Sequence, residues 1–387
     1  MKGLKFLAIL LLFVWIATPA IADNEPIKIG AILGVTGPAA NLGKPEANTL
    51  EMLTTEINKK GGINGHPVQL IIKDSAASPE KAISFAKQLI EEDKVLAIIG
   101  PSTSGESMKI KGIAEDSKTI LMSCAAAEAI VVPVKKYTFK TPQNDRFAAM
   151  KIFYQMNKMG LKKIAVLSSN TGFGNAGKQQ LEKIAPQYGI EIVANEVYDK
   201  EATDLSAVIT KIKTAGAEAI VNWSIEPAQS IVIKNARQAL GPKFPIFQSH
   251  GFGNINYVKA AGAAADGVIF PAGRLLIVDM LPNTNKQKPV LMKYKKDYEA
   301  SFKEEASTFG GHAYDAFMIL TEAIRKAGTD KEKVRDAIEN MKGFVGTGGI
   351  FNFSPADHNG LDIGAFVMLT VKNGKFVLLP DTPAAKK

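Results

Sequence analysis

Strand-length apolar segments alternate with amphipathic segments along most of this chain, and the alternation constrains the fold more than any other feature. In the first half of the chain the apolar segments occur at 27–33, 68–72, 95–99 and 120–122. In the second half they occur at 164–167, 190–197, 219–223 and 245–248. Helical patterns such as Leu50, Leu53 and Ile57 fill the intervals. This succession is typical of parallel sheets that helices cover on both faces.

The two series predict an α/β protein with two doubly wound parallel-sheet lobes. A length of 387 residues agrees with two or three domains. Ligands of doubly wound folds bind at the carboxyl ends of the strands. Two facing lobes therefore predict a ligand cleft between them.

The last part of the sequence adds helices and a terminal hairpin. Helical patterns lie at 289–302, 313–327 and 331–341. Strands are predicted at 348–353, 365–371 and 376–379. The dipeptide Asn373-Gly374 separates the last two strands and is a strong hairpin-turn signal.

Residues 1–22 have the pattern of a secretory signal peptide. Lys2 and Lys5 precede an apolar run from Phe6 to Ala17, and Ala20-Ile-Ala22 follows. A positive start, a short apolar run and an A-x-A end predict cleavage before Asp23. The run is shorter than the roughly 20 residues that a membrane span requires. We therefore expect an exported protein, which in a Gram-negative cell lies in the periplasm.

Composition excludes several classes of function. The formal net charge is +9, and no run of Lys and Arg is longer than a pair, so we expect no nucleic-acid partner. Cys124 is the only cysteine, which excludes an intramolecular disulfide and a thiolate metal cluster. Four histidines show no metal-ligand spacing. We therefore expect neither a metal nor another cofactor.

Several motifs in a fixed order resemble one family. They are Gly37-Pro38, Glu56-Ile-Asn-Lys-Lys-Gly-Gly62, Lys73-Asp74 before Ser78-Pro79, Ile99-Gly-Pro-Ser-Thr-Ser104, Phe139-Lys-Thr141 and Ala265-Asp-Gly-Val268. With these motifs the chain resembles the leucine/isoleucine/valine-binding proteins, the solute-binding components of branched-chain amino-acid ABC transporters. The resemblance extends over nearly the whole chain after the predicted cleavage site.

The resemblance implies a type I periplasmic binding protein, whose two lobes are joined by three crossovers. By that analogy the crossovers lie near 141–144, 270–274 and 359–364. After the signal peptide at 1–22, the N-terminal lobe would comprise 23–141 plus 272–360. The C-terminal lobe would comprise 142–271 plus 361–387.

Binding residues are implied position by position. Ser104 resembles the family's serine that holds the ligand carboxylate, and its place at a helix start suits an anion. Ala126 matches a small residue whose backbone contacts the polar head of the ligand. Phe173 matches an aromatic wall in the second lobe. Trp223 and Ile225 end the strand that supplies the opposite wall.

Three positions depart from the family pattern. Glu128 stands where the amino-acid binders have a threonine, His250 where they have a glutamate that pairs the ligand ammonium, and Leu42 where they have a tyrosine. The ammonium partner could be Glu128, if its side chain enters the cleft. Alternatively the ligand has no ammonium, and His250 donates to a carboxylate, a carbonyl or a hydroxyl group.

The resemblance implies a monomeric, non-enzymatic solute-binding protein of an ABC importer, which captures an amino acid or a related small carboxylate and delivers it to permease subunits. An aromatic or short-chain organic acid without an ammonium group is the alternative ligand. A periplasmic sensor subunit would need the same cleft. The run 172–177 matches G-x-G-x-x-G, but 168–171 separate it from the preceding strand, which disfavours an NAD-dependent oxidoreductase.

Overall fold

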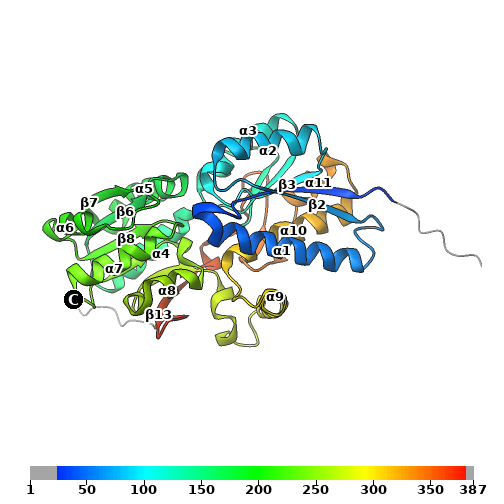
Figure 1. Cartoon of the computed structure of the whole chain (residues 1–387). Helices are drawn as coiled ribbons and strands as arrows, with labels where there is room; N and C mark the ends of the chain where they lie inside the picture. The colour runs from blue at the N-terminus through cyan, green and yellow to red at the C-terminus, as the bar shows by residue number, and fades with distance from the viewer. Residues whose placement is uncertain (1–23, 381–387) are drawn as a thin grey trace, which may run out of the picture.

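The computed structural model describes residues 24–380 of the chain. They form two α/β lobes that lie next to one another, each built around its own sheet (Figure 1). The predicted two-lobe α/β fold is thereby confirmed. The signal peptide at 1–22 and its cleavage before Asp23 lie outside the described residues.

The first lobe contains a five-stranded, wholly parallel sheet in the order β2-β1-β3-β4-β5. Its strands are β1 (Ile27–Leu33), β2 (Val68–Asp74), β3 (Ala97–Ile99), β4 (Ile120–Ser123) and β5 (Thr138–Lys140). In β1, Ile29 pairs with Leu70 on one side and with Ala97 on the other. β1, β3, β4 and β5 are almost entirely buried, which explains their continuous apolar sequences.

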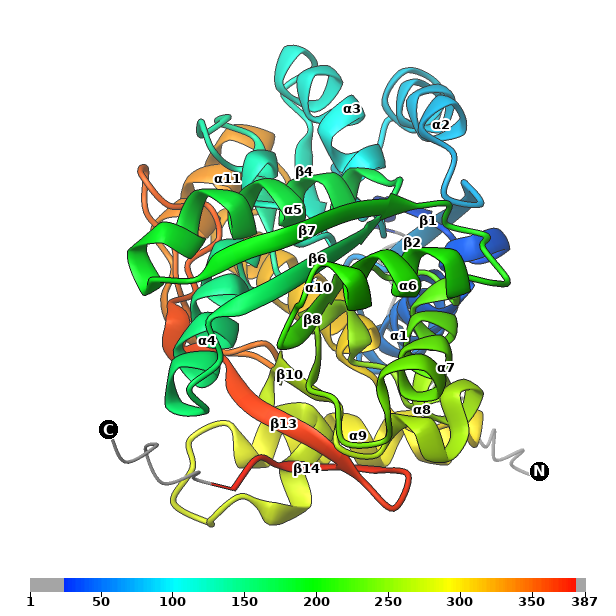
Figure 2. The same ribbon diagram turned by 90° about the vertical axis from the view of Figure 1, so that its left-hand side faces the viewer.

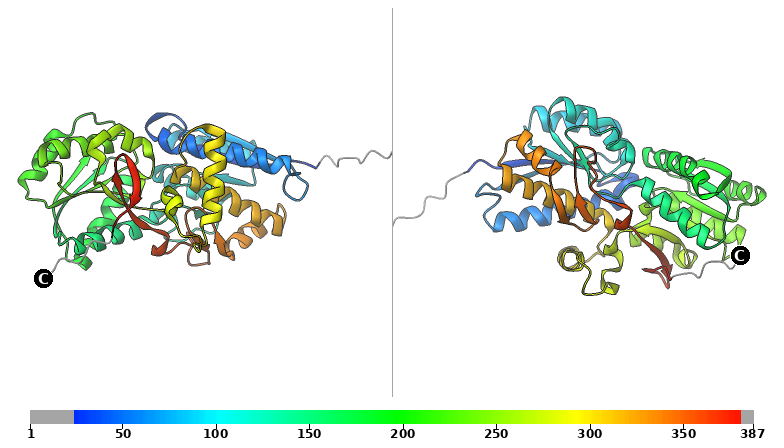
Figure 3. Two further views of the ribbon diagram at one scale, coloured as in Figure 1. Left: turned by 90° about the horizontal axis from the view of Figure 1, so that it is seen from below. Right: turned by 180° about the vertical axis from the view of Figure 1, so that it is seen from behind.

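Helices cover both faces of the first sheet. On one face α2 packs against α3, and elsewhere α1 packs against α10, which also contacts α11. Three helices of this lobe, α9, α10 and α11, come from the distant part of the sequence, as the yellow and orange ribbons show (Figure 3). The bounds are α1 (Ala40–Lys59), α2 (Pro79–Glu91), α3 (Ser104–Asp116), α9 (Lys288–Phe302), α10 (Thr308–Ala327) and α11 (Lys331–Glu339).

The second lobe contains a seven-stranded sheet in the order β14-β13-β10-β9-β8-β6-β7. Its strands are β6 (Lys163–Ser169), β7 (Glu191–Tyr198), β8 (Ala219–Trp223), β9 (Ile246–Gln248), β10 (Ile269–Ala272), β13 (Val367–Lys372) and β14 (Lys375–Leu378). The last two form the predicted hairpin and run antiparallel at the sheet edge, while the other strands are parallel. After β12 the described chain therefore returns to the second lobe.

The second sheet is also covered on both sides (Figure 2). α4 packs with α5, and α7 packs with α6 and α8. The helices are α4 (Asp145–Lys158), α5 (Gly172–Ile184), α6 (Ser206–Thr214), α7 (Ala228–Leu240) and α8 (Ile255–Ala261).

The chain also contains the two-stranded sheet of β11 (Lys342–Val345) and β12 (Ile350–Asn352). The 3₁₀ helices are η1 (Gly37–Ala39), η2 (Glu128–Ile130), η3 (Ala185–Tyr188), η4 (His250–Phe252), η5 (Gly262–Ala265), η6 (Arg274–Met280) and η7 (Ile363–Ala365).

Three passages join the lobes: β5 to α4, β10 to α9, and β12 to β13. Side chains connect these passages to one another. Asn359 Nδ2 donates to the carbonyl oxygen of Pro142 at 2.8 Å, and Gln143 Nε2 donates to that of Gly348 at 2.7 Å. The proposed domain boundaries stay a prediction.

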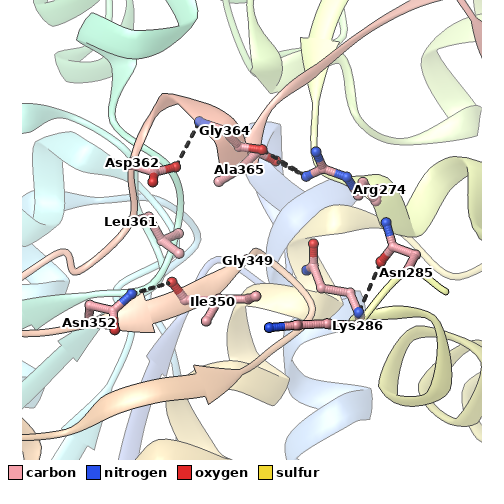
Figure 4. Close-up of a pocket in the computed structure, with 11 residues that line it drawn as sticks. Arg274, Asn285, Lys286, Gly349, Ile350, Asn352, Leu361, Asp362, Gly364 and Ala365 are labelled. Carbon is pink, nitrogen blue, oxygen red and sulfur yellow. Dashed lines mark hydrogen bonds between the residues drawn. The ribbon is translucent and has the colours of Figure 1, made fainter.

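A surface pocket of about 430 Å³ lies beside the second and third passages (Figure 4). There Arg274 Nη1 donates to the carbonyl oxygens of Gly364 and Ala365 at 2.9 and 3.3 Å. This contact ties two crossovers together on the side where the lobes are joined.

Between residues 24 and 380, no helix is both long and apolar enough to cross a bilayer. Within the same range, no group of three or more His, Cys, Asp and Glu side chains is arranged to hold a metal ion.

Candidate functional site

A narrow pocket lies between the lobes and is lined by residues from both, and its cavity volume in this closed form is about 20 Å³. Most of its wall follows the carboxyl ends of strands: Ser104 follows β3, Ala126 follows β4, Phe173 follows β6, Ile225 follows β8 and His250 follows β9. This is where doubly wound folds bind their ligands. The remaining lining residues are Leu42, Ser102, Cys124, Ala125, Pro142, Gly251, Phe309 and His312.

Ser104 is the first residue of α3, and its side chain is buried at the pocket wall. The helix cap itself is Thr103, whose hydroxyl accepts from the amide of Glu106. The Ser104 hydroxyl oxygen accepts a hydrogen bond from the amide of Ala127 at 3.2 Å. Because that oxygen is the acceptor, its own proton stays free for donation to a ligand.

Ala126 lines the first-lobe wall, and its carbonyl oxygen accepts a hydrogen bond from Lys140. Lys140, the last residue of β5, is fully buried, and its Nζ donates to the carbonyl oxygens of Ala126 and Pro142 at 3.0 and 2.9 Å. Burial lowers the pKa of Lys140 to about 7, against the opposing attraction of nearby carboxylates. A buried amine therefore lies directly behind two residues of the pocket wall.

The second-lobe wall is a cluster of rings. Phe173 and Ile225 line the pocket, and their contact with a ligand stays a prediction. The ring of His250 lies edge-on to three others, with centroids 5.4 Å from Phe173, 5.7 Å from Trp223 and 5.4 Å from Phe366. Trp223 does not line the pocket. It lies behind the wall, fully buried, and supports Phe173 and His250.

Glu128 is not among the residues that line this pocket. Its Oε1 pairs with Arg146 Nε at 2.8 Å, and its Oε2 accepts from Gln180 Nε2 at 3.0 Å. Arg146 and Gln180 lie on α4 and α5 of the second lobe. The Glu128 carboxylate therefore bridges the lobes instead of facing a ligand.

Leu42 lines the pocket from α1, at the position where the family has a tyrosine. Sequence reasoning missed Ser102, Cys124, Phe309 and His312 as lining residues. His312 and Phe309 belong to α10, which lies far along the sequence from the first series of strands. The strand–helix pattern carried no signal for them, because only the return of α10 to the first lobe places them here.

Two uncharged imidazoles face this space. Neither ring nitrogen of His250 has a hydrogen-bond partner, and Nδ1 of His312 has none. Burial, followed by the charge of Lys140, lowers the pKa of His250 well below its usual value. The same two causes lower the pKa of His312 to about 3. At neutral pH both rings are neutral, and each can donate one hydrogen bond and accept one.

One carboxyl group lies behind the first-lobe wall. Ser102 Oγ donates to Glu46 Oε2 and accepts from the amide of Gly34 at 3.1 Å. Glu46 is completely buried, and burial raises its pKa well above the usual value. Burial therefore favours the protonated form of this carboxyl group, and Ser102 separates it from the pocket.

The two lobes approach each other closely at the helix starts that flank the pocket. A Cβ atom on Gly172, at the start of α5, would lie 2.5 Å from the Cα atom of Gly105 at the start of α3. Asn254 Nδ2 donates across the same interface to the carbonyl oxygen of Asn41 at 2.9 Å. The cleft is therefore closed around the pocket.

The G-x-G-x-x-G run is explained by packing. A Cβ on Gly174 would lie 2.0 Å from the carbonyl oxygen of Ser169, and one on Gly177 would lie 2.1 Å from Trp223 Nε1. Together with Gly172, all three glycines are required for close contacts within the protein.

Comparison with known proteins agrees with this geometry. The model of a family described as "Periplasmic binding protein" matches residues 26–375. The leucine-, isoleucine-, valine-, threonine- and alanine-binding protein of Pseudomonas aeruginosa is 27% identical over 319 residues, which cover 81% of this chain and 82% of that protein. The Leu/Ile/Val-binding protein BraC3 of Rhizobium johnstonii is 26% identical and covers 82% and 85%.

Solved structures are similar over the same length. An extracellular ligand-binding receptor from Rhodopseudomonas palustris HaA2 superposes with a TM-score of 0.86 at 28% identity, covering 92% of this chain and 99% of that one. The branched-chain amino-acid transporter substrate-binding protein of Streptococcus pneumoniae, in complex with isoleucine, gives 0.80 at 27% identity, covering 91% and 97%.

Proposed function

The chain belongs to the periplasmic binding protein family, and from this premise we propose that it captures one small carboxylate-bearing solute for an ABC importer. The observation that carries the proposal is the closed pocket that both lobes line, with the Ser104 hydroxyl proton free to donate into it. A predicted signal peptide and relatives named for amino-acid binding support a place in the periplasm and an acidic solute. No step in this role changes a covalent bond.

The solute first meets the lobe that carries Ser104 and Ala126. The second lobe then rotates about the three crossovers and brings Phe173, Ile225 and His250 against the solute. Only contacts that exist in the closed state shift the balance between open and closed forms. The second-lobe wall provides those contacts, and the closed shape is the one that we propose the permease recognises.

A thermal-shift screen tests the role. A library that holds amino acids and small organic acids should contain at least one compound that raises the melting temperature of the protein. Binding of such a hit should weaken about tenfold in Ser104→Ala, which corresponds to about 1.4 kcal/mol. Loss of the partner for the Ala127 amide should lower the unliganded stability by about 1 kcal/mol.

Ser117→Ala is the matched control, because Ser117 lies at the far end of the same helix and bonds only to carbonyl oxygens of its own turn. Its affinity should equal that of the unmodified protein. A library without a hit, or an unchanged affinity in Ser104→Ala, would refute the proposed role.

A further inference from the structure

The pocket is lined on one side by carbonyl groups that already have a cationic partner. Lys140 Nζ donates to the carbonyl oxygens of Ala126 and Pro142, and both residues belong to the pocket wall. Each of these carbonyl oxygens therefore already accepts a hydrogen bond from the protein's own amine. An ammonium group that approached them would also approach the amine of Lys140.

No aspartate or glutamate lines the pocket in the described chain. The carboxylate of Glu128 is engaged by Arg146 and Gln180, and Glu46 lies behind Ser102. An ammonium group enclosed here would lose its hydration without gaining a carboxylate partner, and it would lie near the amine of Lys140. Burial of a charge under those conditions is strongly unfavourable.

The polar groups that remain available suit an acid. The Ser104 hydroxyl and one ring nitrogen of each neutral histidine can donate. Both ring nitrogens of His250 and Nδ1 of His312 lack a partner in the protein, and an unsatisfied buried polar group is costly until a ligand completes it. Phe173, Ile225, Phe309 and Leu42 supply apolar surface for the body of the solute.

We propose, on the basis of the proposed function, that the solute is an organic acid with an apolar body and no ammonium group. Its carboxylate meets the donors of the pocket wall near Ser104, and His250 and His312 supply the further hydrogen bonds. The neutral imidazole at position 250 does what a carboxylate there could not do, because it accepts an anion at close range without repulsion.

Matched pairs of compounds that differ only in the amino group test this proposal. Leucine is compared with 4-methylpentanoate, and phenylalanine with 3-phenylpropanoate, by isothermal titration calorimetry of the full exported protein at neutral pH. In at least one pair the deaminated acid should bind, and its amino acid should bind about thirtyfold more weakly or not at all.

The opposite order in the pairs that bind would overturn the proposal, and so would equal affinity. Failure of all four compounds would also reject this class of solute. These outcomes are distinct from failure of the proposed function. That function fails only when the broader library contains no hit, whereas here a better-binding amino acid would support the role and refute the solute class.

Two variants sharpen the result. His250→Glu places a carboxylate in the pocket and should move the affinity ratio of a pair toward the amino acid by about tenfold. His250→Gln keeps a neutral hydrogen-bonding group of similar length and should keep the original preference. Melting curves of the unliganded variants test whether both are folded. A preference for the amino acid in His250→Gln would contradict the proposal.

Discussion

At the scale of single residues, Lys140 determines the electrostatic character of the pocket. Its amine is buried, so solvent does not screen it as at a surface. The carboxyl groups that act on it are Asp145, Glu128 and Asp357, and burial raises the pKa of Asp145 to about 6. Two oppositely charged groups behind the wall thus change their protonation near neutral pH.

Affinity for a carboxylate solute should fall as the pH rises from 6 to 9. Lys140, whose pKa is about 7, loses its positive charge over that range, and Asp145, whose pKa is about 6, carries its negative charge. A bound anion favours the protonated amine, so binding is tightest at pH values below the pKa that Lys140 has in the unliganded protein. We expect about a tenfold decrease, measured by calorimetry across the range.

The control for this pH dependence is Lys140→Met, whose affinity should be lower at pH 6 and should fall less steeply with pH, because the amine no longer titrates while Asp145 still does. The neutral histidines do not titrate between pH 6 and 9, because the pKa of each is lowered. An unmodified protein whose affinity stays constant or rises with pH would contradict the assignment to Lys140.

His312 should make the protein sensitive to acid. The unfolded chain takes up a proton on this residue near pH 6.5, whereas the folded protein does so only near pH 3. Since the unfolded state binds more protons between these values, the free energy of unfolding falls as the pH falls. His312→Gln removes this contribution of His312 to the pH dependence of the free energy of unfolding.

The measurement compares the two proteins by urea denaturation. From pH 6 to pH 4 the unmodified protein should lose about 2.5 kcal/mol relative to His312→Gln. Other titrating groups contribute equally to both proteins and cancel in the difference. A constant difference across that range would show that His312 is accessible to protons in the folded state.

At the scale of elements, the starts of the helices are where sequence and structure differ. The apolar spacing of Leu50, Leu53 and Ile57 indicated only the later part of α1, and the helical pattern predicted α10 from 313. These helices begin at Ala40 and Thr308. The first turns contain residues of low helix propensity, such as Pro45 in α1 and Gly310 in α10. Several of these turns face the cleft, where small residues permit close packing.

Elsewhere the sequence predicted the elements well, because apolar strands alternate regularly with amphipathic helices in the core of each lobe. β1 and β8 begin and end where the apolar runs 27–33 and 219–223 do. α4 and β10 were missed, since they lie next to crossovers where the alternation is interrupted. At the site, six of the eight predicted residues line one pocket, and only the three-dimensional arrangement could show that Glu128 and Trp223 do not.

Gly172→Ala should weaken solute binding about tenfold or more while the stability of the unliganded protein changes little. The added Cβ atom would lie 2.5 Å from Gly105 of the other lobe, so the closed cleft could not form fully. Binding is measured by calorimetry and stability by thermal melting.

Gly112→Ala is the matched control. Gly112 lies on the same helix as Gly105, and a Cβ atom on it would meet no other group within 4 Å. It should keep the original affinity and gain a little stability from the better helix former. Unchanged binding in Gly172→Ala would show that contact at this glycine pair is not needed for capture.

At the scale of the whole molecule, closure depends on contacts that never touch the solute. Glu128 bridges to α4 and α5 of the second lobe, Asn254 bonds back to Asn41, and Lys259 pairs with Glu305 at 3.1 Å. On the side away from the mouth of the cleft, hydrogen bonds from Arg274 and Asn359 hold the crossover segments together. Such an arrangement permits rotation about the joined side while the mouth opens.

Glu128→Ala should therefore shift the protein toward the open form. We expect a three- to tenfold loss of affinity, which is about 1 kcal/mol, without any change in which compounds bind. Small-angle X-ray scattering should show that the variant needs more solute than the unmodified protein to reach the same smaller radius of gyration. Equal affinities and equal radii would exclude a role for this bridge in closure.

Trp223 gives the molecule a built-in optical reporter. The only other tryptophan, Trp15, belongs to the segment that is predicted to be removed on export, so the mature chain would emit from a single indole. That indole lies against Phe173 and His250, one layer behind the incoming solute. The arrival and departure of an unlabelled nutrient could then be timed by rapid mixing at one wavelength, which would give the capture and release rates directly.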